Sequence, residues 1–180
     1  MTHIIERARL FATAAHAAVG QVRKYSGEAY IHHPKRVAAM VQNLGHLSAN
    51  AVAAAWLHDV LEDTKVHKLT MAEEFGLDVT GMVLELTNVE KSAGNRRERF
   101  QMNLERLRNC SPEAATIKLA DIIDNTGSIV KHDPRFAEVY LAEKEQVLMA
   151  LRHGSLPLWQ QAHEIVEEGL TQFRRLGAAA

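Results

Sequence analysis

Four ionisable side chains fall within six positions at the end of the apolar stretch AAWLHDVLEDT, which closes with Thr64. On a helix, residues four apart share a face, so His58 lies above Glu62 and Asp59 above Asp63. The apolar residues that precede His58 indicate that this segment is buried, and an isolated buried carboxylate costs many kcal/mol. The pattern therefore predicts a positive partner, either a divalent metal ion or an Arg or Lys side chain. A solvated helix end is the alternative interpretation.

Two more residues extend this group. His33 follows the loop-like segment GEAYIH and precedes Pro34, whose fixed φ stiffens the backbone beside it. Asp121 is the first acid of TIKLADIIDN, a segment in which it is surrounded by apolar residues. Two imidazoles and two carboxylates form a mixed nitrogen and oxygen set, which suits Mn²⁺, Fe²⁺ or Zn²⁺ better than Ca²⁺.

Helical periodicity dominates the segments that must position these residues. An apolar stripe at three- and four-residue steps over 4–18 predicts the first helix. Ser48 and Ser111 are predicted N-caps. No alternating run typical of a strand occurs, so we expect an all-α helical bundle forming one domain over 1–180. The further helices are expected at 34–45, 49–62, 69–75, 77–88, 94–108, 112–131, 134–152 and 155–176.

Composition excludes several classes of protein. The 180 residues are 47% hydrophobic and 24% charged, which is ordinary globular composition. A net charge of −1 gives no electrostatic footprint for nucleic acid or an anionic membrane. No run approaches the roughly 20 apolar residues of a membrane span. A single cysteine, Cys110, excludes an intramolecular disulfide, and with no signal peptide pattern we expect a cytoplasmic protein.

The order His33, His58-Asp59, Asp121 resembles the H…HD…D signature of HD-domain metal-dependent phosphohydrolases. The match is closer to the hydrolase domain of RelA/SpoT homologues. GQVRKYSGEAYIHHPKRVA resembles the pattern GQ-x-RKSGEPYI-x-HP-x-x-VA, AAWLHDVLEDT resembles AALLHDVVEDT, and KLADIIDN resembles KLADRLHN. The resemblance covers roughly residues 5–170, and the overall length is similar to that of the stand-alone small alarmone hydrolases.

The resemblance implies a metal centre with a catalytic pair beside it. One Mn²⁺ would be held by the four residues of the signature, His33, His58, Asp59 and Asp121. The carboxylates of Glu62 and Asp63 would activate the attacking water. Such chemistry needs a metal to neutralise phosphate charge and lower the pKa of bound water, and a neighbouring carboxylate to accept the proton.

The resemblance also implies a nucleotide pocket. Arg23 and Lys24 match a basic pair at its mouth, where a guanidinium plane can stack on a purine; an exposed loop pair is the alternative. Asn125 matches a residue near the ribose and phosphates. Tyr140 matches an aromatic residue that lines the pocket, although it could equally be a core tyrosine. Arginines of NRRERF (95–100) could contact phosphate or form a charged helix face.

Three positions depart from the family pattern on the segment that carries Asp121. Ile122 and Gly127 stand where a positive side chain is common, and Asp124 stands where His or Tyr is common. We therefore expect less positive charge and an extra acid here, with the metal ligands intact. His16, which also matches the pattern, is expected to be a structural core histidine.

The sequence thus predicts a Mn²⁺-dependent pyrophosphohydrolase that removes the 3′-pyrophosphate from a magic-spot nucleotide, (p)ppGpp or an adenosine analogue such as (p)ppApp. One alternative is another HD nucleotide phosphohydrolase, acting on 5′-nucleotides or NADPH. Another is a nucleotide sensor that has kept the metal but lost turnover. The partner is expected to be a small nucleotide, and the sequence leaves the oligomeric state open.

Overall fold

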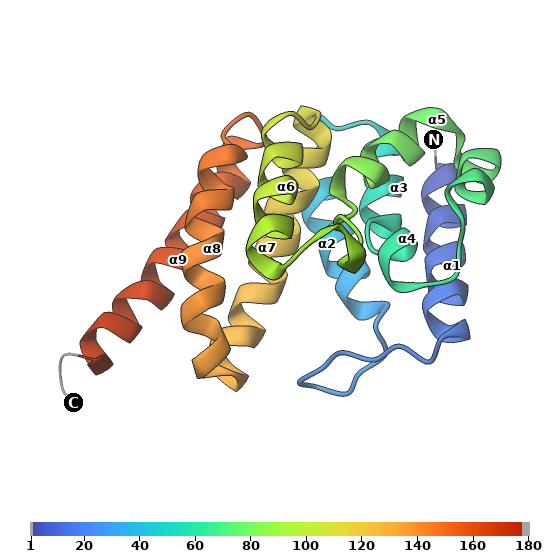
Figure 1. Ribbon diagram of the computed structural model, residues 1–180. Helices are drawn as coiled ribbons and strands as arrows, with labels where there is room; N and C mark the ends of the chain where they lie inside the picture. The colour runs from blue at the N-terminus through green and yellow to red at the C-terminus, as the bar shows by residue number, and fades with distance from the viewer. Residues whose placement is uncertain (1, 178–180) are drawn as a thin grey trace.

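The computed structural model describes residues 2–177, and side chains from 3 to 172, as an assembly of packed helices (Figure 1). The all-α bundle expected from the sequence is confirmed, and within 2–177 the extended pairing is an isolated bridge between Val22 and Ala29. The helices are α1 Thr2–Ala18, α2 His32–Asn43, α3 Ala49–Leu57, α4 Val60–Asp63, α5 Lys68–Leu86, the short 3-10 turn η1 Lys91–Ala93, α6 Arg96–Arg108, α7 Pro112–His132, α8 Pro134–Ala150 and α9 Leu156–Gly177.

Side-chain caps fix the start of several helices. The Ser48 side chain accepts a hydrogen bond from the Ala51 amide at α3, and Ser111 does the same for Ala114 at α7, as the sequence predicts. Asn95 caps α6 in a reciprocal capping box with Glu98, so this helix begins later than the expected 94. Each cap satisfies an amide that would otherwise have no partner in the first turn.

The prediction of one continuous helix over 49–62 is wrong in one respect, because the helix is interrupted at His58-Asp59. α3 ends at Leu57 and α4 begins at Val60, with Asp59 at φ −98° and ψ −6° between them. The Tyr30 hydroxyl donates to the Asp59 carboxylate over 2.6 Å, which holds this side chain toward α2. A turn at this point lets adjacent side chains face one centre, which a regular helix would spread about 100° apart.

The helix α3 lies at the centre of the fold. It packs against α1, α2, α5 and α7, and its residues 51–57 are all buried. Alanines at four of these positions allow the neighbouring helices to approach closely. On the other side of α7, helices α8 and α9 pack on α7 and on each other (Figure 1). The C-terminal end of α3 thus delivers His58 to the interior between α2 and α7.

A loop over 19–31 links α1 to α2 and carries several of the predicted site residues. It is pinned by hydrogen bonds from the Arg23 amide to the Glu28 carbonyl and from the Tyr30 amide to the Gln21 carbonyl. Within the part of the chain that the structure describes, no helix combines the length and apolarity needed to cross a membrane.

Candidate metal centre and its flanking cavities

Three of the four residues predicted as metal ligands, His33, His58 and Asp59, offer ligand atoms within 4.8 Å of one another, and the Asp121 carboxylate lies beside the two imidazoles. His33 comes from α2, His58 and Asp59 from the junction of α3 and α4, and Asp121 from α7. His33 Nε2 lies 3.2 Å from Asp121 Oδ1 and 3.5 Å from Asp59 Oδ2. His58 Nε2 lies 3.1 Å from the same Asp59 oxygen. Nitrogen and oxygen ligands therefore converge from segments far apart in sequence.

The chemistry of this donor set fits a cation. His33 Nδ1 lies 2.6 Å from the Asp124 carboxylate and His58 Nδ1 lies 2.9 Å from the Ala55 carbonyl, so each Nδ1 is the N–H donor. In the neutral ring the lone pair then sits on Nε2, as a metal ligand requires. Both Nε2 atoms are buried and have no hydrogen-bond partner. Lone pairs and carboxylates facing one another need positive charge between them, and a divalent metal ion supplies it.

The histidines and carboxylates of this centre shift one another's pKa values. Burial lowers the pKa of His33, but the neighbouring carboxylates of Asp121, Asp124 and Asp59 outweigh it and raise the pKa to about 11. Burial raises the pKa of Asp59, but the two histidines hold it well below its usual range. A centre that attracts a proton this strongly also attracts a metal ion in its place.

Asp121 stands between two sets of polar partners. Its Oδ1 accepts a hydrogen bond from the Asn125 amide over 2.6 Å, and its Oδ2 pairs with the Lys118 ammonium over 2.8 Å. Burial raises the pKa of Asp121, but Lys118 and His33 outweigh that effect and lower it. Both oxygens are thus oriented before any ligand binds, which fixes this carboxylate toward His33.

Asp124, expected as an extra acid on this segment, has three partners. It is buried on the His33 side of α7, accepts hydrogen bonds from His33 Nδ1 and Arg36 Nε, and lies 3.7 Å from an Arg23 nitrogen. Burial raises the pKa of Asp124, but the hydrogen bonds from His33 and Arg36 outweigh this effect and lower the pKa below its usual value. A carboxylate behind a ligating histidine fixes the ring orientation and increases its basicity. The expected excess of negative charge is therefore corrected by these partners.

The two predicted catalytic acids are held differently. Glu62 is exposed, and both of its oxygens accept hydrogen bonds from Asn88. Asp63 accepts a hydrogen bond from the Gln21 amide over 2.8 Å, and Gln21 in turn contacts His16 Nδ1 over 2.7 Å. Burial raises the pKa of Asp63, and this outweighs the Gln21 hydrogen bond. His16 is 1% exposed, consistent with the expected core role.

Three of the four predicted substrate contacts line one cavity of about 500 Å³ between the 19–31 loop and α7. Arg23, only 13% exposed, donates to the Asn125 side-chain oxygen over 2.8 Å. Lys24 is 71% exposed and pairs with Asp133. We call this cavity the loop-side cavity; its lining residues are Gln21, Val22, Arg23, Lys24, Tyr25, Tyr30, Asn125, Ser128, Ile129 and Phe136.

Tyr140, the fourth predicted contact, lies in the core. It is 8% exposed, its hydroxyl lies 3.3 Å from the Thr126 hydroxyl, and the Lys144 ammonium sits 4.9 Å from its ring centre. It is absent from the lining of the loop-side cavity. Of the two interpretations left open for this residue, the geometry favours the core tyrosine.

A second cavity, of about 320 Å³, lies on the α6 and α8 side of the metal centre. We call it the α6–α8 cavity. Glu62 lines it together with Lys118, which pairs with Asp121, and Arg96 and Arg99 of the NRRERF segment also line it. Arg97 does not line this cavity but an adjoining one of about 450 Å³, which shares Arg96, Phe100 and Glu143 with it.

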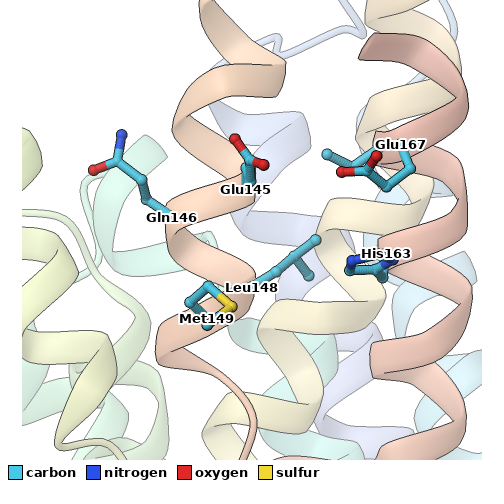
Figure 2. A pocket seen from close by; sticks show the side chains of 7 residues that line it. Glu145, Gln146, Leu148, Met149, His163 and Glu167 are labelled. Carbon is cyan, nitrogen blue, oxygen red and sulfur yellow. The ribbon is translucent and has the colours of Figure 1, made fainter. Parts of the chain in front are cut away.

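A third depression lies between α8 and α9 (Figure 2). Its labelled side chains include Glu145, Glu167, His163 and the apolar Leu148 and Met149. Two carboxylates and no cation line it, so it is unsuited to a polyanionic nucleotide.

Sequence reasoning missed several residues that support the site. Tyr30 donates to Asp59, and Gln21 orients Asp63. Both lie inside the quoted loop pattern, which was the available signal. Arg36 also lies inside that pattern, whereas Lys144 lies outside every quoted motif and reaches the site only through the tertiary arrangement.

The chain is similar in sequence to a known family and to several named proteins. A family model described as an HD domain matches residues 8–178. A Xenopus tropicalis relative named guanosine-3′,5′-bis(diphosphate) 3′-pyrophosphohydrolase MESH1 is 36% identical over 106 residues, 58% of each chain. A Mycoplasma pneumoniae relative named probable guanosine-3′,5′-bis(diphosphate) 3′-pyrophosphohydrolase is 29% identical over 139 residues, 72% of this chain and 18% of that one. The chain spans less than two thirds of these relatives.

Solved structures show the same fold. A structure described as a metazoan ortholog of SpoT that hydrolyzes ppGpp and plays a role in starvation responses superposes with a TM-score of 0.82 at 27% identity, covering 93% of this chain and 97% of that chain. A Listeria monocytogenes crystal structure gives a TM-score of 0.68 at 21% identity, covering 82% of this chain and 99% of that one. The second likeness concerns the fold alone.

Proposed function

Because the chain belongs to the HD domain family, we propose that it is a Mn²⁺-dependent hydrolase that removes the 3′-pyrophosphate from a purine magic-spot nucleotide. The substrate is (p)ppGpp or an adenosine analogue such as (p)ppApp. The observation that carries the proposal is the convergence of His33, His58, Asp59 and Asp121, with two buried Nε2 atoms that have no hydrogen-bond partner. The names of the relatives support the choice of substrate.

His33, His58, Asp59 and Asp121 would hold the metal ion. When bound, it supplies charge neutralisation at the scissile phosphate and lowers the pKa of a water molecule. Mixed imidazole and carboxylate ligation is compatible with Mn²⁺. Asp124 orients His33 through Nδ1, and Tyr30 orients Asp59, so these partners pre-organise the centre.

Hydrolysis adds water across the bond that joins the nucleotide to its 3′-pyrophosphate. Asp63 accepts the proton of the attacking water, because burial raises its pKa and makes its carboxylate a better base. Glu62, anchored by Asn88, orients the water. The 3′ oxygen regains a proton, leaving a nucleoside 5′-di- or triphosphate and pyrophosphate.

The loop-side cavity receives the purine nucleoside. Arg23 and the aromatic rings of Tyr25 and Phe136 line it and offer planar surfaces for a base. Asn125 lies between Arg23 and Asp121, so it is placed to contact the ribose next to the metal centre. Stacking recognises any purine, which is why both guanine and adenine nucleotides are candidate substrates.

The test is to incubate the purified protein with Mn²⁺ and, separately, with ppGpp, pppApp, GTP and NADPH. Products are separated by anion-exchange chromatography and pyrophosphate is quantified. Release of pyrophosphate with GDP or ATP from the first two nucleotides is expected. Phosphate release from NADPH or GTP alone would indicate the other kind of HD phosphohydrolase. Binding of ppGpp without any product would indicate a sensor.

A further inference from the structure

The two cavities described above lie on opposite sides of Asp121. Asn125, which lines the loop-side cavity, donates to Asp121 Oδ1, whereas Lys118, which lines the α6–α8 cavity, pairs with Oδ2. Glu62 also lines the α6–α8 cavity and comes from the short helix that follows His58-Asp59. Asp121 therefore contacts one lining residue of each cavity, and from this arrangement we infer that a substrate cleaved at the metal centre can extend into both.

The α6–α8 cavity is strongly cationic. Its lining includes five cationic side chains and two carboxylates, together with apolar and amide groups. The cationic side chains are Lys91, Arg96, Arg99, Lys118 and Lys144. One carboxylate, Glu143, is already paired with Arg96 over 2.9 Å, and the other, Glu62, is held by Asn88. A surplus of positive charge remains for an anionic ligand.

Lys144 is a partly buried cation of this cavity that has no carboxylate partner among the described side chains. It is partly buried on α8, and its ammonium lies over the Tyr140 ring, 4.9 Å from the ring centre. The ion pairs found among side chains 3–172 include none to Lys144. Burial, aided by the positive charge of Lys118, lowers the pKa of Lys144 to about 8. An ammonium held this way, facing a cavity of about 320 Å³, gains most from an anion that enters the cavity.

We propose that the α6–α8 cavity is the binding site for the pyrophosphate leaving group, with Lys144 and Lys118 contacting its phosphates at the end nearest the metal centre. Arg96 and Arg99 contact it from the outer end. This inference rests on the proposed function, because it assigns one product to each side of Asp121. The nucleoside stays in the loop-side cavity, where aromatic residues and Arg23 lie.

The lining chemistry distinguishes the two cavities as sites for different parts of the substrate. The loop-side cavity is lined by Tyr25, Tyr30 and Phe136, which suit a planar base. The aromatic ring in the α6–α8 cavity is Phe100, among five cations. Charge-assisted hydrogen bonds from lysine and arginine to phosphate are roughly twice as strong as neutral ones. Positive charge that meets the departing pyrophosphate also stabilises the charge that builds up on it during cleavage.

The experiment measures binding of inorganic pyrophosphate to the Mn²⁺-loaded protein by isothermal titration calorimetry, with metal content checked after each titration. Lys144→Met should weaken pyrophosphate binding about tenfold, the loss of one charge-assisted contact. Lys144→Arg, which keeps the charge, should stay within about threefold of wild type. Lys68→Met, at an exposed lysine that begins α5, is the matched control and should leave Kd unchanged.

A second measurement separates the two cavities. The affinity for GDP should be the same in wild type and Lys144→Met, because the nucleoside product occupies the other side of Asp121. Unchanged pyrophosphate binding in Lys144→Met, or a loss that falls on GDP instead, would overturn the assignment. If Lys144→Met does not fold, Arg96→Met tests the same cavity from the exposed start of α6, with about threefold weaker pyrophosphate binding expected.

These measurements distinguish a failure of the pyrophosphate site from a failure of the proposed function. If the protein releases no pyrophosphate from any magic-spot nucleotide but pyrophosphate binding still depends on Lys144, the function fails and the anion site stands. If turnover is observed and Lys144→Met binds pyrophosphate and cleaves ppGpp like wild type, the function stands and the anion site is wrong. Under the proposal, the variant shows weaker pyrophosphate product inhibition and a lower kcat.

Discussion

The carboxylates of Glu62 and Asp63 are adjacent in sequence but differ in their surroundings. Asp63, which is exposed like Glu62, lies at the end of a chain of contacts through Gln21 to the buried His16, and partial desolvation together with the charges of Asp59 and Glu62 raises its pKa. Glu62 is exposed, held by Asn88, and faces the α6–α8 cavity. The two acids therefore differ in their hydrogen-bond partners, and under the proposed function Asp63 is the general base while Glu62 lies beside the path of the leaving group.

Replacing Asp63 by Asn should lower kcat by 10²–10⁴, roughly the contribution of general base catalysis. The amide still accepts the Gln21 hydrogen bond but cannot take a proton from water. Glu62→Gln should lower kcat as well while keeping Asn88 in place. Metal content and the Kd for ppGpp, measured on the same preparations, should match wild type. Turnover near the wild-type value in either variant would exclude that residue from the catalytic step.

Arg23→Ala should raise KM by about tenfold for ppGpp and pppApp alike, because a stacked guanidinium contributes roughly 1–2 kcal/mol without reading the base edge. Steady-state kinetics on both nucleotides provide the check. A loss confined to one base would mean that Arg23 makes a base-selective contact. Lys24→Ala is the comparison, and it should raise KM by less because the Lys24 side chain is 71% exposed.

Lys144 also gives a pH-dependent prediction for stability in the metal-free protein. Its pKa is about 8 in the fold, below its ordinary value of 10.5, because burial and Lys118 disfavour the charge. Between these values the unfolded chain binds the proton and the folded one does not, so this group makes wild-type stability rise with pH. Lys144→Met should therefore be more stable than wild type at pH 7, by on the order of 1 kcal/mol.

The stability advantage of Lys144→Met should shrink as pH rises from 8 to 10.5, since the wild-type lysine loses its charge over that window. Urea denaturation of both proteins at pH 7 and pH 10 measures the difference. An advantage that is equal at the two pH values would show that the gain comes from apolar packing of the methionine and not from removing the ammonium.

Helix α7 carries Asp121, Asp124 and Asn125, so its placement controls the metal centre and the loop-side cavity together. Its start is fixed by Ser111, which caps the helix and also donates its hydroxyl to Glu85 on α5 over 2.6 Å. The helix is therefore joined to α5 at the same point where its first turn is capped.

Ser111→Ala should lower the free energy of unfolding by about 1–2 kcal/mol, at the upper part of the range for loss of an N-cap, because the Glu85 contact is lost as well. Chemical denaturation is the measurement. Ser26→Ala, in the exposed 19–31 loop, is the control and should change stability by less than about 0.5 kcal/mol. A Ser111 variant as stable as wild type would mean that α7 is held by its packing alone.

The metal centre ties together three parts of the molecule that are remote in sequence, namely α2, the α3–α4 junction and α7. A ligand that binds the folded state alone stabilises it, by about 2.7 kcal/mol at a hundredfold excess over Kd. For a chain of this size that corresponds to a rise in Tm of about 5–10 °C. Mn²⁺ should therefore stabilise the whole fold.

Thermal unfolding of the Mn²⁺-loaded and EDTA-treated protein tests this expectation. Asp59→Ala should bind no metal by elemental analysis and should show the same Tm with and without Mn²⁺, since three ligands leave less charge and an open position. Asp78→Ala, an exposed acid on α5, is the control and should respond like wild type. A Tm that rises with Mn²⁺ in Asp59→Ala would place the ion elsewhere.

The helical class, and the residues expected to form the metal centre, can be predicted from the amino-acid sequence alone. Helical periodicity and the N-caps Ser48 and Ser111 act locally, within one or two turns, so they can be read from neighbouring residues. The H…HD…D spacing predicted His33, His58, Asp59 and Asp121 because ligand residue types are few and their chemistry is specific. The interruption at Asp59 was not predicted, since it depends on Tyr30 from another segment.

Only the tertiary structure decided what stands opposite each side chain. Periodicity tells which face of a helix is buried but not which residue of another helix meets it. The sequence therefore shows Asp124 only as an extra acid, whereas in the fold its carboxylate pairs with His33 and Arg36. In the same way, Lys144 of α8 and Lys118 of α7 line one cavity although 26 positions separate them in the sequence. Charges brought together by helix packing acquire partners and pKa values that a linear sequence does not display.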